Sequence, residues 1–162
     1  MRMLKLAALV GLTVAVLAAG VAGAQGPPAY GPSIALDQAK KAMAGAEAEA
    51  KKNNWNVVIA ILDSGGNIVL LQRLDNAQFG SVEVARQKAY SAVAFRRPTK
   101  AFQDGMAAGG AGLGLLRLEG ASVLNGGLSI IVDGKVIGSI GVSGVTGEQD
   151  AQIARAGADA LK

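Results

Sequence analysis

Two adjacent arginines followed by a proline and a threonine are the residues of this sequence best suited to bind an anion. They lie in AVAFRRPTKAF, residues 92–102, where an apolar helix-like run stops at Arg96 and Arg97. Pro98 disfavours helical geometry at Arg97, and Thr99 can cap a following short helix. Two guanidiniums would then lie beside free amides and a hydroxyl, which suits a carboxylate or phosphate. A structural alternative exists, because cations at a helix C-terminus are favourable in themselves.

The chemistry open to the chain is limited by two residue types that it lacks. Its 162 residues include no histidine and no cysteine. This excludes Ser-His-Asp and Cys-His catalysis, and it excludes zinc sites built on imidazole or thiolate. Any reaction must therefore use carboxylates, Lys, Arg, hydroxyls, Met, backbone amides or a cofactor.

Two further groups have residue types that could bind a ligand, and each has a structural alternative. Asp63, Arg73 and Asp75 could form a ligand site, but a structural ion pair is the simpler interpretation, and Asp before a turn often binds nearby backbone. The glycines of GSIGVSGVTGEQD, residues 138–150, resemble a phosphate loop only loosely, because the P-loop lysine is missing and the segment follows a hairpin. Ser143, Thr146 and the helix N-terminus that follows could still receive an anion.

The first 24 residues are expected to be a signal peptide, residues 1–24, and not part of the fold. MRMLK gives a basic start, residues 6–19 are uncharged and mostly apolar, and Ala22-Gly23-Ala24 has the small-x-small pattern of a cleavage site. The apolar run is short for a bilayer span of about 20 residues, which favours cleavage over a membrane anchor. The mature chain, beginning at Gln25, is expected to be periplasmic or secreted with no stable membrane span.

The expected mature chain is only weakly basic. Without Arg2 and Lys5, fourteen basic side chains stand against twelve acidic ones, and the formal net charge falls from +4 to +2. No basic run exceeds two residues and aromatic residues are few. Nucleic-acid binding is therefore not expected.

One α+β domain over residues 34–162 is expected to position these side chains, after a flexible Pro- and Gly-rich leader over residues 25–33. Hydrophobic periodicity and capping patterns predict four helices, over residues 36–52, 81–95, 100–107 and 147–161. Two apolar, β-rich stretches predict hairpins, over residues 56–74 and 128–144. The glycine-rich stretch 105–114 is expected to be flexible. Because hairpins pair antiparallel, the predicted architecture is one antiparallel sheet of about five strands with helices packed on it.

Four segments of the chain occur in an order that is typical of a known family. They are ILDSGGNIVLLQRLDNA, SVEVARQKAYSAVAFRRPT, GGLSIIVDGKVIGSIGVSG and TGEQDAQIARAG. Over residues 34–161 the chain resembles the GlcG/HbpS family of haem-binding proteins. The resemblance implies a profilin-like antiparallel sheet flanked by helices, assembly into dimers or larger oligomers, and binding of haem. Exported members are common, and a related domain accompanies corrinoid adenosyltransferases.

The resemblance also suggests which residues would hold haem. The family's RPT element matches Arg97, Pro98 and Thr99, and Thr99 is the candidate for the contact with the iron. Arg97 or Arg96 would hold a propionate, since guanidiniums bind carboxylates well. Without histidine an ordinary histidine-ligated haem cannot form, which favours oxygen ligation by Thr99 or Tyr90. The other soft or phenolate candidates are Met43, Met106 and Tyr30.

The leading hypothesis is an exported, non-enzymatic protein that binds haem for storage, sensing or scavenging, or binds another small anionic ligand, and that forms a homo-oligomer. One alternative is an enzyme that degrades haem or acts on small hydroxy- or ketoacids. In the latter case Arg96 or Arg97 would orient the carboxylate, with Asp63 or Asp75 as base. No two carboxylates pair convincingly in the sequence, which disfavours this enzyme. Another alternative is an oligomeric scaffold or a partner of an envelope sensor.

Overall fold

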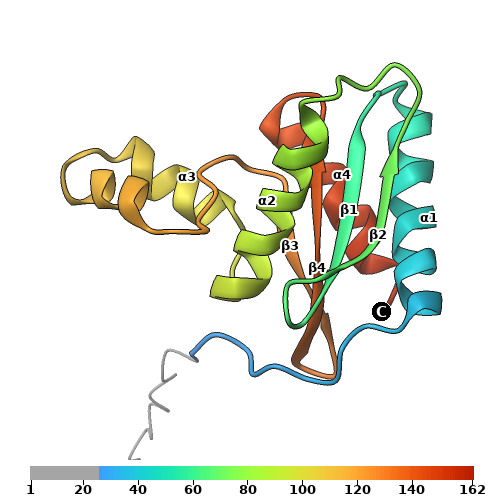
Figure 1. The fold of residues 1–162 in the computed structure, drawn as a ribbon, viewed down its shortest axis with the longest axis horizontal. Coiled ribbons are helices and arrows are strands. Elements are labelled where there is room, and N and C mark those ends of the chain that lie inside the picture. Colours follow the sequence, from blue (N-terminus) through green and yellow to red (C-terminus); the bar gives the residue numbers. More distant parts are fainter. Residues whose placement is uncertain (1–25) are drawn as a thin grey trace, which may run out of the picture.

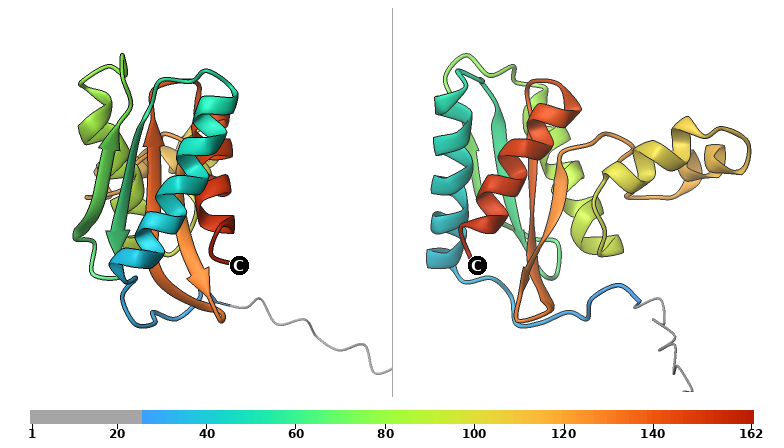
Figure 2. Two further views of the ribbon diagram at one scale, coloured as in Figure 1. Left: turned by 90° about the vertical axis from the view of Figure 1, so that its right-hand side faces the viewer. Right: turned by 180° about the vertical axis from the view of Figure 1, so that it is seen from behind.

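A four-stranded antiparallel sheet runs through the molecule and carries helices on both faces (Figures 1 and 2). The computed structural model describes residues 26–162, so the expected signal peptide lies outside the described part of the chain. The strand order is β2-β1-β4-β3. The strands are β1 Val58–Asp63, β2 Ile68–Arg73, β3 Gly127–Val132 and β4 Lys135–Ser143. The predicted α+β fold is confirmed, with four strands in the sheet where about five were expected.

The central strand β1 is buried on both faces of the sheet. Ile59 and Ile61 pack in the larger core beneath α1 (Leu36–Lys52) and α4 (Gly147–Asp159). The alternate residues Val58, Ala60 and Leu62 pack toward α2 (Ser81–Phe95) on the other face. This two-sided burial explains why the strand has no polar face in the sequence.

Of the two helices on the larger core, α1 has the predicted bounds, whereas α4 ends at Asp159, two residues before the predicted end. Helix α1 buries a stripe of small side chains and Met43, so this methionine belongs to the core. Helix α4 begins with the predicted capping box, in which Thr146 Oγ1 accepts from the Gln149 N–H. Within residues 26–162, no helix has the length and apolar character needed to cross a membrane.

The glycine-rich stretch expected to be flexible is instead helical. It contains the end of α3 (Lys100–Ala107) and most of a 3₁₀ helix, η1 (Gly110–Arg117). Together α3 and η1 form an arm that projects from the body of the protein (Figure 1). The prediction was wrong because the glycines permit close packing: a Cβ on Gly112 would overlap the carbonyl of Gly105.

Part of the leader expected to be flexible is attached to the sheet. The Gly31 N–H donates to Val136 O at 2.9 Å, and the Val136 N–H donates to Ala29 O at 2.8 Å. The Tyr30 hydroxyl donates to Val93 O at 2.8 Å, at the end of α2. These bonds hold the leader along the edge of the hairpin β3–β4 and across the C-terminal end of α2.

A buried ion pair connects the helices of the two faces. Lys88 Nζ of α2 lies 2.8 Å from Asp150 Oδ2 of α4, and each side chain is only 3% exposed. Lys88 also donates to Val142 O at 2.9 Å, while Asp150 Oδ1 accepts from the Val145 N–H. Burial raises the pKa of Asp150, and the neighbouring Lys88 ammonium opposes this increase.

Replacing Lys88 by Met is expected to destabilise the fold by about 3–5 kcal/mol, because it leaves Asp150 buried without its counter-ion. Loss of the ammonium should raise the pKa of Asp150 further. The folded protein then retains a proton that the unfolded chain releases near the ordinary value of 3.8, so stability should fall as pH rises above that value. Urea unfolding at several pH values measures this deficit.

The control is the double variant Lys88→Met/Asp150→Asn, in which no buried charge remains. It should recover much of the lost stability and show little of the added pH dependence. A Lys88→Met variant whose deficit relative to the wild type is the same at acidic and neutral pH would contradict this account of the pair.

Candidate functional site

Thr99, the candidate for an iron contact, is fully buried and its hydroxyl is already bonded. Thr99 Oγ1 accepts from the Gly127 N–H at 2.9 Å, and the Thr99 N–H donates to Gly127 O at 3.0 Å. Thr99 occupies the N-cap position of α3, as predicted, but its side chain does not cap the helix. Its hydroxyl instead fastens the start of the arm to the first residue of β3.

Arg97 also lies at the base of the arm. It is exposed, and its guanidinium carbon lies 5.6 Å from the centre of the Phe102 ring of α3. That ring packs edge-on against Phe95 at the end of α2, with 5.2 Å between the ring centres. Residues 95–102 therefore form a hinge through which α2 carries the arm.

Arg96 lies within this hinge, but its side chain contacts the leader. It adopts a left-handed conformation with φ 51°, which ends α2. Its NH1 donates to Pro28 O at 3.1 Å, and its guanidinium lies 5.1 Å from the centre of the Tyr30 ring. The expected anion contact of Arg96 stays a prediction, and in the structure this arginine also packs within the chain.

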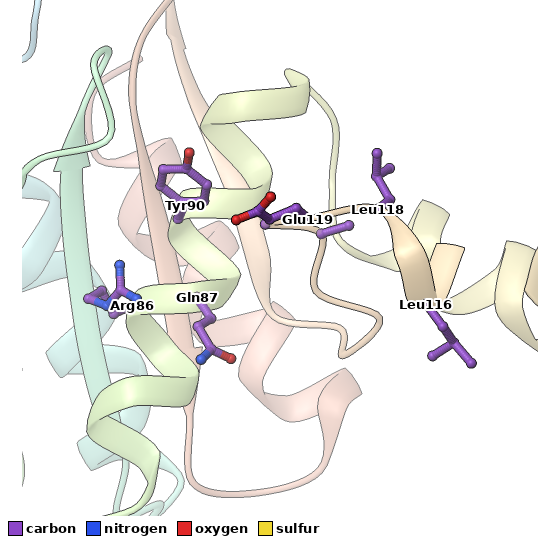
Figure 3. A pocket seen from close by; sticks show the side chains of 8 residues that line it. Arg86, Gln87, Tyr90, Leu116, Leu118 and Glu119 are labelled. Atoms are coloured by element: carbon purple, nitrogen blue, oxygen red, sulfur yellow. The ribbon is translucent and has the colours of Figure 1, made fainter. Parts of the chain in front are cut away.

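Tyr90 lines a large groove between α2 and the segment that returns from the arm (Figure 3). The groove has a volume of about 760 Å³. Leu116 and Leu118 supply exposed apolar side chains on the arm side. Arg86, Gln87 and Glu119 supply the polar groups. An aromatic ring, two leucines and a few polar groups are a composition suited to a large, flat, amphipathic ligand.

The Tyr90 ring is held between two glycines that come from different parts of the chain. A Cβ on Gly66 would lie 3.0 Å from Tyr90 Cε2, and a Cβ on Gly120 would lie 2.8 Å from Tyr90 Cε1. Both glycines have positive φ, of 83° and 79°. The ring edges thus fit against bare backbone, while the residue remains 39% exposed.

The turn that carries Gly66 is ordered by Asp63. Asp63 Oδ1 accepts from the Asn67 N–H at 2.8 Å and from the Gly65 N–H at 2.9 Å. These bonds lower the pKa of the Asp63 carboxyl, and the bond from the Asn67 N–H has the largest effect. The prediction that this aspartate binds turn backbone is confirmed. The ordered turn supports one side of the Tyr90 ring through Gly66.

Arg86 is the cation of the groove, and it is paired with a glutamate on the same helix. Its Nε and NH2 donate to Glu83 Oε2 and Oε1 at 2.9 and 2.6 Å. Gln87 Nε2 also donates to Glu83 Oε1 at 2.9 Å. These bonds lower the pKa of Glu83 to about 2, and the bonds from Arg86 have the largest effect. Any anionic ligand must therefore share Arg86 with an ionised carboxylate.

A smaller cavity lies at the RPT corner, on the other side of the hinge. It has a volume of about 200 Å³ and is lined by Arg96, Arg97, Pro98 and, from α4, Arg155. It shares no lining residue with the groove at Tyr90. The structure therefore does not bring the four predicted residues into one site. Tyr90 lines the groove, and Arg96 and Arg97 line the cavity. Thr99 is buried and lines neither of them.

The other candidate groups have structural roles. Within residues 26–162, Arg73 and Asp75 form no salt bridge with each other, so the expected ion pair is not formed; Arg73 NH1 instead lies 3.5 Å from Ala77 O. Ser143 Oγ donates to Ser81 Oγ, and Thr146 is used in the cap of α4. In the same described range, no three His, Cys, Asp or Glu side chains gather as a metal site.

Sequence reasoning missed most of the groove. Arg86 has the appearance of an ordinary exposed helix residue, and Leu116 and Leu118 fall after a glycine-rich stretch with little periodicity. No local signal shows that this stretch returns to α2. Tyr90 was the only lining residue identified, as a possible phenolate ligand.

Comparison with known proteins gives a consistent result. The family model described as "Haem degrading protein HbpS-like" matches residues 34–159. Protein GlcG of Escherichia coli K12 is 38% identical over 110 residues, which cover 68% of this chain and 81% of GlcG.

Two solved structures are similar over most of their length. The PduOC:haem complex is 30% identical with a TM-score of 0.74, and the match covers 80% of this chain and 96% of that one. A double mutant of HbpS from Streptomyces reticuli is 30% identical with a TM-score of 0.75, and the match covers 98% of this chain and 99% of that one.

Replacing Thr99 by Val is expected to destabilise the protein by about 1–3 kcal/mol, because it keeps the side-chain shape but leaves the buried Gly127 N–H without a partner. Thr99→Ser, which keeps the hydroxyl, should lose less. Urea unfolding followed by circular dichroism measures both. Equal stability of the Val and Ser variants would show that the bond to Gly127 is not what holds the hinge.

Proposed function

We propose that this chain, which belongs to the HbpS-like family, binds haem in the groove between α2 and the segment returning from the arm. The observation that carries the proposal is the groove itself, with about 760 Å³ of space bounded by Tyr90, Leu116 and Leu118. The solved haem complex of the similar PduOC structure supports haem as the ligand. The cavity at the RPT corner, at about 200 Å³, offers much less room.

The residues of the groove fit haem in their chemistry. The two leucines and the Tyr90 ring provide apolar contact for the macrocycle, and the Tyr90 phenol provides an oxygen ligand of a kind that haem iron accepts. Arg86 provides a guanidinium for a propionate, shared with Glu83. When bound, haem would supply a redox-active iron. The protein would contribute binding, orientation and partial exclusion of water.

For Thr99 and Arg97 we propose a positioning role. Thr99 fixes the start of the arm to Gly127, and Arg97 packs over Phe102 in the arm. Since the arm forms one wall of the groove, loosening this hinge would change the shape of the groove. A direct contact between Thr99 and iron would require its bonds to Gly127 to open.

We further propose that the working protein is exported, is periplasmic or secreted, and binds haem without turning it over, for storage, sensing or scavenging. The basic start, apolar run and small-x-small site within residues 1–24 support export. The absence of histidine from the sequence supports weak oxygen ligation over a tightly held, catalytic haem.

Assembly into a homo-oligomer is also part of the proposal, with the arm as the contact. The arm and the segment after it expose the large apolar side chains of Leu113, at 51%, and Leu124, at 52%. These would be covered if the projecting arm packed against a second copy of the chain. Leu116, which lines the groove, lies on the same arm, and Leu118 follows directly after the arm.

Tyr90→Phe is expected to weaken hemin binding at least tenfold and to change the absorption spectrum, because it removes the proposed oxygen ligand while keeping the ring. Thr99→Val should also weaken binding, through the position of the arm, but leave the spectrum of the bound form unchanged. A titration followed at the Soret band measures both effects.

Arg155→Gln is the matched control for that titration, because Arg155 lines the cavity at the RPT corner and not the groove. Hemin affinity should be unchanged in this variant. Weaker binding in Arg155→Gln together with unchanged binding in Tyr90→Phe would move the haem site to the RPT corner.

Leu113→Lys is expected to shift the protein from oligomer toward monomer, because it places a charge in the proposed contact without touching the groove. Light scattering after size-exclusion chromatography measures the mass. Lys40→Ala, an exposed change on α1, should leave the mass unchanged. A wild-type protein that is monomeric at high concentration would rule out this role of the arm.

A further inference from the structure

We propose that a polar groove around Trp55, separate from the haem groove, binds a saccharide. It lies at the end of the sheet where α1 finishes and β2 runs into the loop before α2, in the upper part of Figure 1. The chain contains only this one tryptophan. None of the residues that line the haem groove or the RPT-corner cavity takes part.

The groove consists of two adjoining hollows that share a floor. Their volumes are about 400 and 330 Å³. Four residues line both hollows, so the two form one continuous surface: Asn54, Trp55, Asn56 and Asn76. Each hollow falls within the range of about 300–1,000 Å³ that is typical of small-molecule sites.

The charges of the groove cancel, which argues against an ionic ligand. Lys51 Nζ lies 2.5 Å from Glu47 Oε1, and this pair borders the first hollow. Arg73 and Asp75 add one charge of each sign. A carboxylate, a phosphate or a metal ion would meet no excess of the opposite charge, so a neutral polar ligand fits best.

The remaining side chains are mostly amides around one aromatic residue. Asn54, Asn56 and Asn76 are exposed, and Gln72 and Gln78 line the hollows beside them. A side-chain amide donates and accepts hydrogen bonds in one plane, which matches a pair of neighbouring hydroxyls. Gln78 Nε2 already donates to Ser81 Oγ at 3.0 Å, and Gln72 bonds to Glu47. The three exposed asparagines are therefore the side chains proposed to bind a polyol without a charge.

Trp55 provides the apolar part of the recognition. It is half-buried, packs against the larger core and lines both hollows, so its position is fixed by packing. A saccharide has hydroxyls around its edge and C–H groups on its face, and the C–H face packs well on a tryptophan ring. An apolar ligand would leave the amides without partners, which is costly.

The single tryptophan makes the proposal directly testable in the purified, haem-free protein. Titration with neutral sugars, from glucose, galactose and N-acetylglucosamine to their short oligomers, should give a saturable change in Trp55 emission for at least one of them. A glycan array probed with the labelled protein identifies which one. Asn54 and Asn76 have positive φ, of 56° and 62°, a conformation that glycine adopts without strain. Asn54→Gly and Asn76→Gly, which remove the amides and keep this conformation, should each weaken the binding at least fivefold.

Two controls separate this site from the rest of the molecule. Lys40→Ala, on the same helix as Glu47 but outside the groove, should bind the sugar as the wild type does. Tyr90→Phe should also bind it normally, so failure of the haem proposal would leave this result unaffected. Unfolding curves confirm that the asparagine variants are folded.

Three outcomes would overturn the proposal. The first is that no sugar changes the emission of Trp55 or is retained on the array. The second is that binding is unchanged in folded Asn54→Gly and Asn76→Gly proteins. The third is that peptides, and not glycans, compete for the groove.

Discussion

Two glycines at the start of β3 leave the space in which the elements of both faces of the sheet meet. A Cβ on Gly126, whose φ is +121°, would lie 2.8 Å from Asp150 Cβ and 3.0 Å from Lys88 Nζ. A Cβ on Gly127 would lie 2.7 Å from Thr99 Cγ2 and would overlap the Lys88 carbonyl. The buried ion pair and the base of the arm therefore both depend on bare backbone at this place. Any side chain here would separate α2 from β3, and with it the arm from the body.

The proposed haem site inherits its shape from this junction. Helix α2 carries Tyr90 and Arg86, and its far end carries the hinge at residues 95–102. The hinge sets the direction of α3, and η1 brings Leu116 back toward α2 (Figure 3). The RPT element thus matters for the groove although none of its three residues lines it.

Local patterns predicted most of the fold but little of the site. The bounds of α1 and α2, the two hairpins and the cap at Thr146 follow from periodicity and turn chemistry, which act over a few residues. The partner of the Thr99 hydroxyl lies 28 residues away, so no local signal could reveal that bond. The burial of Lys88 could not be predicted for a similar reason. A lysine is almost never fully buried without a partner, and the partner of Lys88 is Asp150 on another helix. Glycines in the arm suggested flexibility, whereas they permit two short helices to pack.

The arm leaves the body and returns to it at neighbouring points. It departs at Thr99, which is bonded to Gly127, and on its return the Ser122 N–H donates to Ser91 Oγ of α2 at 3.0 Å. The sheet and its two cores do not include the intervening residues 103–120. Insertions, deletions or replacement of residues 103–120 can therefore alter the wall of the groove without changing the sheet or its two cores. Related chains have a route to diverge in ligand while their sheets stay alike.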